Sequence, residues 1–144
     1  MYSLDSIQEA ILAYLDTQFV QPVIEQAIPD SQTVLRNRPG NIDPYLAVQF
    51  GDPQARGARA MAGPTGDDYS LPIYTQVIAP DPSIARKLSN KVNRVFLGET
   101  FPWAGSVRKR AGGNMFPIVT STGATEAYQF PASFGLLIQL SLDA

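Results

Sequence analysis

The sequence predicts an α+β domain with a mixed or antiparallel β-sheet and amphipathic helices packed on one face. Segments with the helical spacing of apolar residues are interspersed with segments in which apolar and polar residues alternate. The chain has 144 residues, of which 44% are hydrophobic, and this is enough for one core. No repeat or low-complexity tract divides it. We therefore expect residues 1–144 to form a single domain, with a long loop between two central strands.

The first predicted helix runs to about residue 19, and a capping-box spacing marks its beginning. Ser6 and Glu9 have the spacing of that signal. Pro22 suits the first turn of a second, short helix in the sequence PVIEQAI. The residues expected on the buried face of the first helix are Ile7, Ile11, Tyr14, Leu15 and Phe19.

A longer helix is predicted at 82–97 because both of its ends carry boundary signals. Asp81 is a good N-cap, Pro82 fits the first helical position, and Gly98 stands where a C-terminal cap is wanted. Its expected apolar stripe is Ile84, Leu88, Val92, Val95 and Phe96. Its other face is basic and is interpreted as a solvated surface, with phosphate contact as the alternative: Arg86, Lys87, Lys91 and Arg94.

Strands are predicted on both sides of a polar loop at 51–70. The strand before it, at 44–50, is expected to place Leu46, Val48 and Phe50 on one face and Tyr45, Ala47 and Gln49 on the other. The strand after it, at 69–79, is expected to place Leu71, Ile73 and Val77 on one face and Tyr74 and Ile78 on the other. Pro72 predicts that the first half of the later strand lies on a sheet edge or outside the ladder, because proline has no N–H to donate. An earlier strand is predicted at 33–38.

The last third of the chain predicts an antiparallel meander. Strands at 105–110 and 115–120 flank the turn-forming sequence AGGN. A final strand near 128–142 follows, and one of its faces is fully apolar.

Composition limits the classes of function. The chain has 11 basic and 13 acidic residues, a net charge of -2, so nothing draws the chain as a whole to nucleic acid or to an anionic membrane. It has neither histidine nor cysteine, hence no imidazole or thiol for a nucleophile or for an ordinary zinc site. Asp5, Glu9 and Asp16 interrupt what would be the apolar run of a signal peptide. We expect a soluble protein with no catalytic residue, cofactor, metal or specific nucleic-acid partner.

The 51–70 loop holds four candidate contact residues. Arg56 and Arg59 lie in its first half, and Asp67 and Asp68 lie near its end. One interpretation of the loop is a surface insertion without a role. In that case Asp67 and Asp68 are solvated turn residues, with ligands of a hard cation as the alternative. The other is an arm that orders against a neighbouring subunit or a partner, where the arginines would bind carboxylates.

Three further candidates lie in the last third. Trp103 is either an exposed anchor for a partner or a residue at the rim of the core. Arg108 and Arg110 share one side of a predicted strand, with Lys109 on the other. They either contact nucleic acid or protect an edge strand from pairing, and edge protection is the favoured interpretation.

The order of these elements resembles a known family. It comprises an N-terminal amphipathic helix, the strand PYLAVQFGD, a long loop, the strand-to-helix segment VIAPDPSIARKLSNKVNRVFLG at 77–98, and a closing β-meander. Over nearly the whole chain this order is similar to that of the tail terminator, or tail completion, proteins of long-tailed bacteriophages. These small α+β proteins form a ring, usually hexameric, at the head-proximal end of the tail tube, where they stop its growth and present a surface to the head connector.

The resemblance implies a structural virion protein without catalytic residues. Its expected partners are other copies of itself, the tail tube protein and the head–tail connector protein, and its expected place is the neck region of the tail, after assembly in the host cytoplasm. A neck or head-completion protein is the alternative within the same setting. From other classes, a small cytoplasmic ligand-binding domain and an enzyme built on paired carboxylates stay open.

Overall fold

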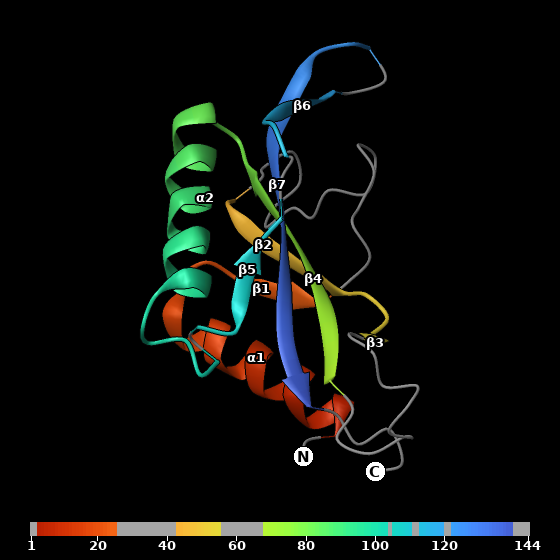
Figure 1. Ribbon diagram of the computed structural model, residues 1–144. Helices are drawn as coiled ribbons and strands as arrows, with labels where there is room; N and C mark the ends of the chain where they lie inside the picture. Colours follow the sequence, from red (N-terminus) through yellow and green to blue (C-terminus); the bar gives the residue numbers. More distant parts are fainter. Residues whose placement is uncertain are drawn as a thin grey trace.

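The computed structural model describes residues 3–25, 43–55, 68–103, 105–110, 113–119 and 122–139. The strand expected at 33–38 lies outside these ranges. In chain order the elements are α1 (Leu4–Gln18), β1 (Val23–Glu25), β2 (Tyr45–Phe50), β3 (Gln54–Ala55), β4 (Asp68–Ala79), α2 (Pro82–Leu97), β5 (Val107–Lys109), β6 (Phe116–Val119) and β7 (Thr125–Gln139). The predicted α+β class is confirmed (Figure 1).

All seven described strands belong to one mixed sheet. Its main order is β1-β2-β4-β7-β5, with β3 paired to β4 and β6 paired to β7. The pairing of β1 with β2 is parallel, and the other pairings are antiparallel. The long strands β4 and β7 pair over the whole length of β4, from Asp68 opposite Gln139 to Ala79 opposite Tyr128. These two strands form the centre of the sheet, and both helices lie on the same side of it (Figure 1).

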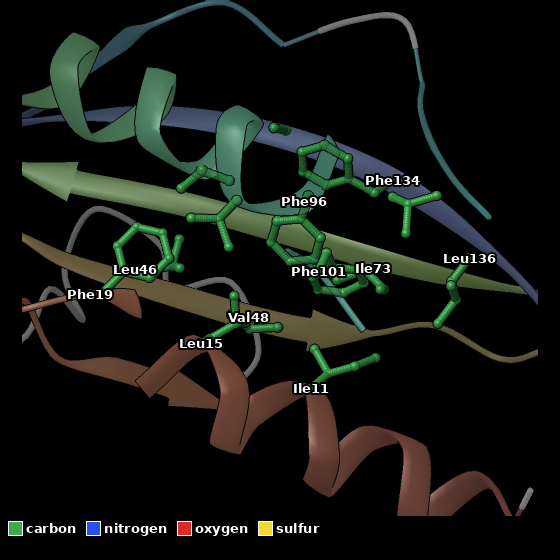
Figure 2. Close-up of a cluster of buried hydrophobic side chains, with 14 of the residues drawn as sticks. Ile11, Leu15, Phe19, Leu46, Val48, Ile73, Phe96, Phe101, Phe134 and Leu136 are labelled. Atoms are coloured by element: carbon green, nitrogen blue, oxygen red, sulfur yellow. The ribbon is translucent and has the colours of Figure 1, made fainter. Parts of the chain in front are cut away.

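The main core lies between the helices and one face of the sheet. Figure 2 shows its centre, where side chains of both helices meet those of β2, β4 and β7. Phe96 of α2 stacks on Phe134 of β7 with ring centroids 4.5 Å apart and an interplanar angle of 11°. Phe101 extends this contact, 5.2 Å from Phe96, and Tyr14 of α1 meets Phe101 edge-on at 5.6 Å. The aromatic rings therefore join the sheet to both helices.

The predicted buried face of α1 is confirmed by Ile7, Ile11 and Leu15, each at most 1% exposed. The capping prediction is wrong by three residues. The N-cap is Ser3, whose Oγ accepts a hydrogen bond from the Ser6 backbone N–H at 3.3 Å. The helix begins earlier because Leu4 also packs against the core, which places Ser6 inside the first turn.

The helix at 82–97 has its predicted bounds but differs from the prediction at its N-cap and at one core position. Asp81 occupies the N-cap, where its side chain makes no capping hydrogen bond; Pro82 takes the first helical position, and the helix ends before Gly98. Ile84 is 37% exposed, contrary to expectation, because it lies at the margin of the apolar stripe. Ala85 and Ser89 are buried there instead.

The short helix predicted from Pro22 is wrong, since Val23–Glu25 form the strand β1. Val23 and Ile24 are β-branched and favour an extended backbone. The Pro22 carbonyl accepts a hydrogen bond from the Leu46 N–H at 3.0 Å, which starts the parallel ladder with β2. Pro22 therefore stands just before a strand, where its missing N–H costs nothing.

Pro72 lies in the interior of the sheet, so the prediction of an edge position is wrong. Its carbonyl accepts from the Gly51 N–H at 2.9 Å, and the N–H and C=O of one residue point to the same neighbouring strand. The absent N–H of Pro72 therefore faces Gly51, where β2 has ended and β3 has not begun. Proline is tolerated in this central strand because its neighbour is interrupted at the same level.

The predicted meander is also wrong in its pairing. β5 and β6 do not pair with each other; both pair with β7, at Phe134–Leu136 and at Thr125–Gln129 respectively. β7 has 15 residues, so one edge accommodates two short strands in succession. Pro131 faces the interval between β5 and β6. Gly113 has a positive φ of 93°, and a side chain at Gly113 would collide with the Pro131 carbonyl.

Candidate assembly surface

Four of the seven candidate contact residues lie in or beside the loop after β2. Arg56, Arg59 and Asp67 lie outside the described residues. Asp68 is the first residue of β4, where its backbone pairs with Gln139. The segment between the described strands β3 and β4 is therefore 56–67, shorter than the loop predicted from the sequence, and the proposed role of its arginines stays a prediction.

Trp103 is a half-buried residue at the rim of the main core. Its ring lies 5.9 Å from that of Phe101 at an angle of 56°. Its carbonyl accepts a hydrogen bond from the Ser106 N–H at 2.9 Å, which closes the turn leading into β5. This geometry favours the rim interpretation over an anchor held out for a partner.

Arg108 and Arg110 are exposed on and beside β5, the terminal strand of the main sheet order. Arg108 is opposite Gly135, and the Arg110 N–H donates to the Ser133 carbonyl at 2.8 Å. The intervening Lys109 is exposed on the other face, the one covered by the helices. Edge protection requires an edge strand with exposed basic side chains, and β5 has this arrangement.

Of these residues, Lys109 lies on the same side of the sheet as α2, which packs beside β5, while Arg108 and Arg110 lie on the opposite face. Every lysine and arginine among the described residues lies between 86 and 110. We call this set the basic flank: Arg86, Lys87, Lys91, Arg94, Arg108, Lys109 and Arg110. Within it, the Lys91 ammonium lies 5.0 Å from the centroid of the Phe19 ring, so that this side chain also binds α2 to the end of α1 through a cation–π contact.

Acidic residues gather on α1 and β1. α1 packs beside β1 and contains no lysine or arginine. Asp5, Glu9 and Asp16 are exposed and, at about 100° per residue, fall within about 40° of one another around the helix, away from the buried face. Glu25 is exposed at the end of β1. We call these four residues the acidic flank.

The sequence shows each charged residue but not how these residues are grouped in space. The three acids of α1 interrupt an apolar run in the sequence, and their helical spacing is the signal that could have predicted an acidic stripe on this helix. Glu25 could not be placed, because its segment was interpreted as a helix. Outside the acidic flank, Asp81 and Glu99 lie at the two ends of α2.

The described residues contain no group of three or more His, Cys, Asp or Glu arranged to hold a metal ion. Nor is either of the helices in this part of the chain long and apolar enough to cross a membrane. Comparison with protein-family models gave no match, and comparison with curated protein sequences gave none either. The features of the described residues that bear on function are therefore the fold and its two charged flanks.

Proposed function

We propose that this protein is a ring-forming structural subunit of a bacteriophage tail, a tail terminator that ends tube growth at the head-proximal end and offers a surface to the head connector. The observation that carries the proposal is the order of elements. The N-terminal helix, the strand β2 and the long strand β4, which leads through Asp81 and Pro82 into α2, follow the order on which the resemblance rests. The closing strands come last, as in that order, but β5 and β6 pair with β7 and do not form a meander.

The distribution of charge gives the proposal a physical basis. A ring is built from heterologous contacts, in which one surface of each subunit meets a different surface of the next. Such a subunit needs two unlike, complementary surfaces. Glu25 of the acidic flank and Lys109 of the basic flank lie on β1 and β5, the two ends of one sheet order, whereas the helical parts of the two flanks meet where Lys91 of α2 contacts Phe19 after α1. This supports a protein whose role is geometric.

The first experiment measures particle mass by light scattering, with negative-stain images of the same sample. The proposal expects a closed ring of several copies. Incubation with polymerising tail tube protein should then give tubes with capped ends and limited length. A protein that neither assembles with itself nor binds tube ends is not a tail terminator. Binding to filled heads but not to purified tails would identify the alternative, a neck or head-completion protein.

A second experiment addresses the loop after β3. Because Gln54 and Ala55 pair with β4, the segment to replace by a short Gly/Ser linker is 56–67. We expect nearly unchanged melting of the single subunit and weaker capping. Arg56→Glu combined with Arg59→Glu should weaken capping in the same way, more sharply at low salt. Normal capping by the shortened protein would show that the loop is not needed.

A further inference from the structure

We infer that the basic flank binds the acidic flank of a second copy of this chain, so that α2 and β5 of one subunit meet α1 and β1 of the next. The inference rests on the proposed function in that a ring requires such a head-to-tail contact. It goes further by naming the two surfaces and the interaction that joins them.

The first argument is the segregation of charge. The basic flank holds every described lysine and arginine, while α1 and β1 hold none. On α2 the four basic side chains occupy the face opposite the buried residues, and on α1 the acidic stripe is also opposite the buried face. Both sets are therefore exposed away from the sheet, and contact between them in two copies would join mostly unlike charges, with Asp81 and Glu99 at the ends of α2 as the exceptions.

The second argument is the geometry of the two sheet edges. Arg110 N–H and Ser106 C=O are bonded to β7, so the backbone groups of Val107 and Lys109 point outward from β5. On β1 the Pro22 carbonyl is bonded to β2, and by the same alternation the backbone groups of Val23 and Glu25 point outward. Lys109 and Glu25 both project toward the helix side of the sheet, so the two edges match in charge on the same side.

Each flank also exposes a large apolar side chain. Leu97, 48% exposed, lies on the outer face of α2 between Arg86 and Arg94 around the helix. Val20, 94% exposed, follows the C-terminal end of α1. Protein interfaces combine apolar contacts with a polar rim, and these two residues supply apolar area in surfaces that are otherwise charged.

A second copy is favoured over nucleic acid because the chain itself supplies the complementary surface. A phosphate backbone would satisfy the basic flank but would leave the acidic stripe of α1 without a role. The net charge of -2 also adds a repulsive long-range field toward a polyanion. Phosphate binding is nevertheless a definite outcome of the test below.

The test uses two charge-reversed variants of the full chain. In the first, Glu9→Lys and Asp16→Lys make the α1 surface basic. In the second, Arg86→Glu and Arg94→Glu make the α2 surface acidic. Each variant alone should associate with itself at least about tenfold more weakly than the wild type, measured by light scattering and sedimentation, because like charges then meet at every contact. Far-UV circular dichroism and thermal melting confirm that both variants are folded.

The decisive sample is an equimolar mixture of the two variants. Their surfaces are complementary when the variants alternate, so association should return to within about threefold of the wild type. A control with the same change in net charge as the first variant, Asp43→Lys with Asp52→Lys, alters exposed acids outside both flanks and should associate normally. Higher salt should weaken the wild-type and the mixed assemblies alike.

The outcomes separate the inference from the proposed function. A wild-type ring that forms equally well in both variants overturns the inference and leaves the ring itself standing. A wild type that never associates removes the ring and this inference together. If the second variant loses binding of a short DNA duplex, followed by fluorescence anisotropy, while its particle mass is unchanged, the basic flank binds phosphates and the inference is wrong.

Discussion

Replacing Phe134 by alanine should be among the most destabilising single changes in this protein. The side chain is 0% exposed, at the centre of β7, and its ring stacks on Phe96. Truncation of a buried phenylalanine costs about 3–5 kcal/mol through lost burial and the cavity left behind. Phe116→Ala in β6 is the matched control. Its side chain is 42% exposed, so the same truncation should cost only about 1 kcal/mol.

Urea unfolding measures both values. With a denaturant slope of about 2 kcal/mol/M, Phe134→Ala should lower the midpoint by about 2 M and Phe116→Ala by about 0.5 M. Trp103 is the sole tryptophan, and it packs near this cluster through Phe101. Its fluorescence should therefore change together with the far-UV circular dichroism if unfolding is two-state.

A double-mutant cycle tests the stacking itself. Phe96→Leu and Phe134→Leu keep the core filled, and their coupling free energy should be about 0.5–1.5 kcal/mol. Equal midpoint shifts for the two alanine variants, or a coupling near zero, would refute the assignment of the aromatic cluster as the link between β7 and α2.

Three further predictions concern local features. Leu88→Ala should lower the free energy of unfolding by about 2–5 kcal/mol and Lys87→Ala by less than about 0.5 kcal/mol, because Leu88 is buried and Lys87 is exposed. Urea titration measures both values, and similar values for the two variants would contradict the orientation of α2. Gly113→Ala should cost more than about 1 kcal/mol, because a positive φ and the nearby β7 carbonyl both exclude a side chain; unchanged thermal melting would show that this segment adapts. Lys91→Gln should lower the free energy of unfolding by about 0.5–1 kcal/mol, because its cation–π contact with Phe19 is lost. Combining it with Phe19→Leu in a double-mutant cycle measures the coupling between the two side chains, and a coupling near zero would show that the contact does not stabilise the fold.

The elements predicted well are those whose signals are local. Helix α2 has its boundary residues in sequence at both ends, and β2 is a short, mostly apolar run that ends at the turn-forming residues after Phe50, so neither depends on distant residues. Local signals failed where one residue suits two structures. Pro22 fits the first turn of a helix as well as the residue before a strand, and only the ladder with β2 decides between them.

The pairing of strands could not be predicted because it depends on lengths and interruptions elsewhere. Two short strands joined by a turn indicate a hairpin, yet β5 and β6 find a longer partner in β7. The candidate surface has the same limitation. Each charged residue was visible in the sequence, but the division into two flanks follows from β1 and β5 being the ends of the sheet order.

The interruptions at the two prolines also bear on how copies of this chain would meet. Pro72 faces the interval between β2 and β3, and Pro131 faces that between β5 and β6. The edge strands are also short: β1 and β5 have three residues each, and β6 has four. Short edges resist open-ended strand pairing between molecules, and β1 and β5 in addition carry charged side chains. Contact through these edges can therefore add few backbone hydrogen bonds, and most of the specificity must come from side chains. Since these side chains are charged and outward, assembly should be sensitive to ionic strength, which a continuous backbone ladder between subunits would not be.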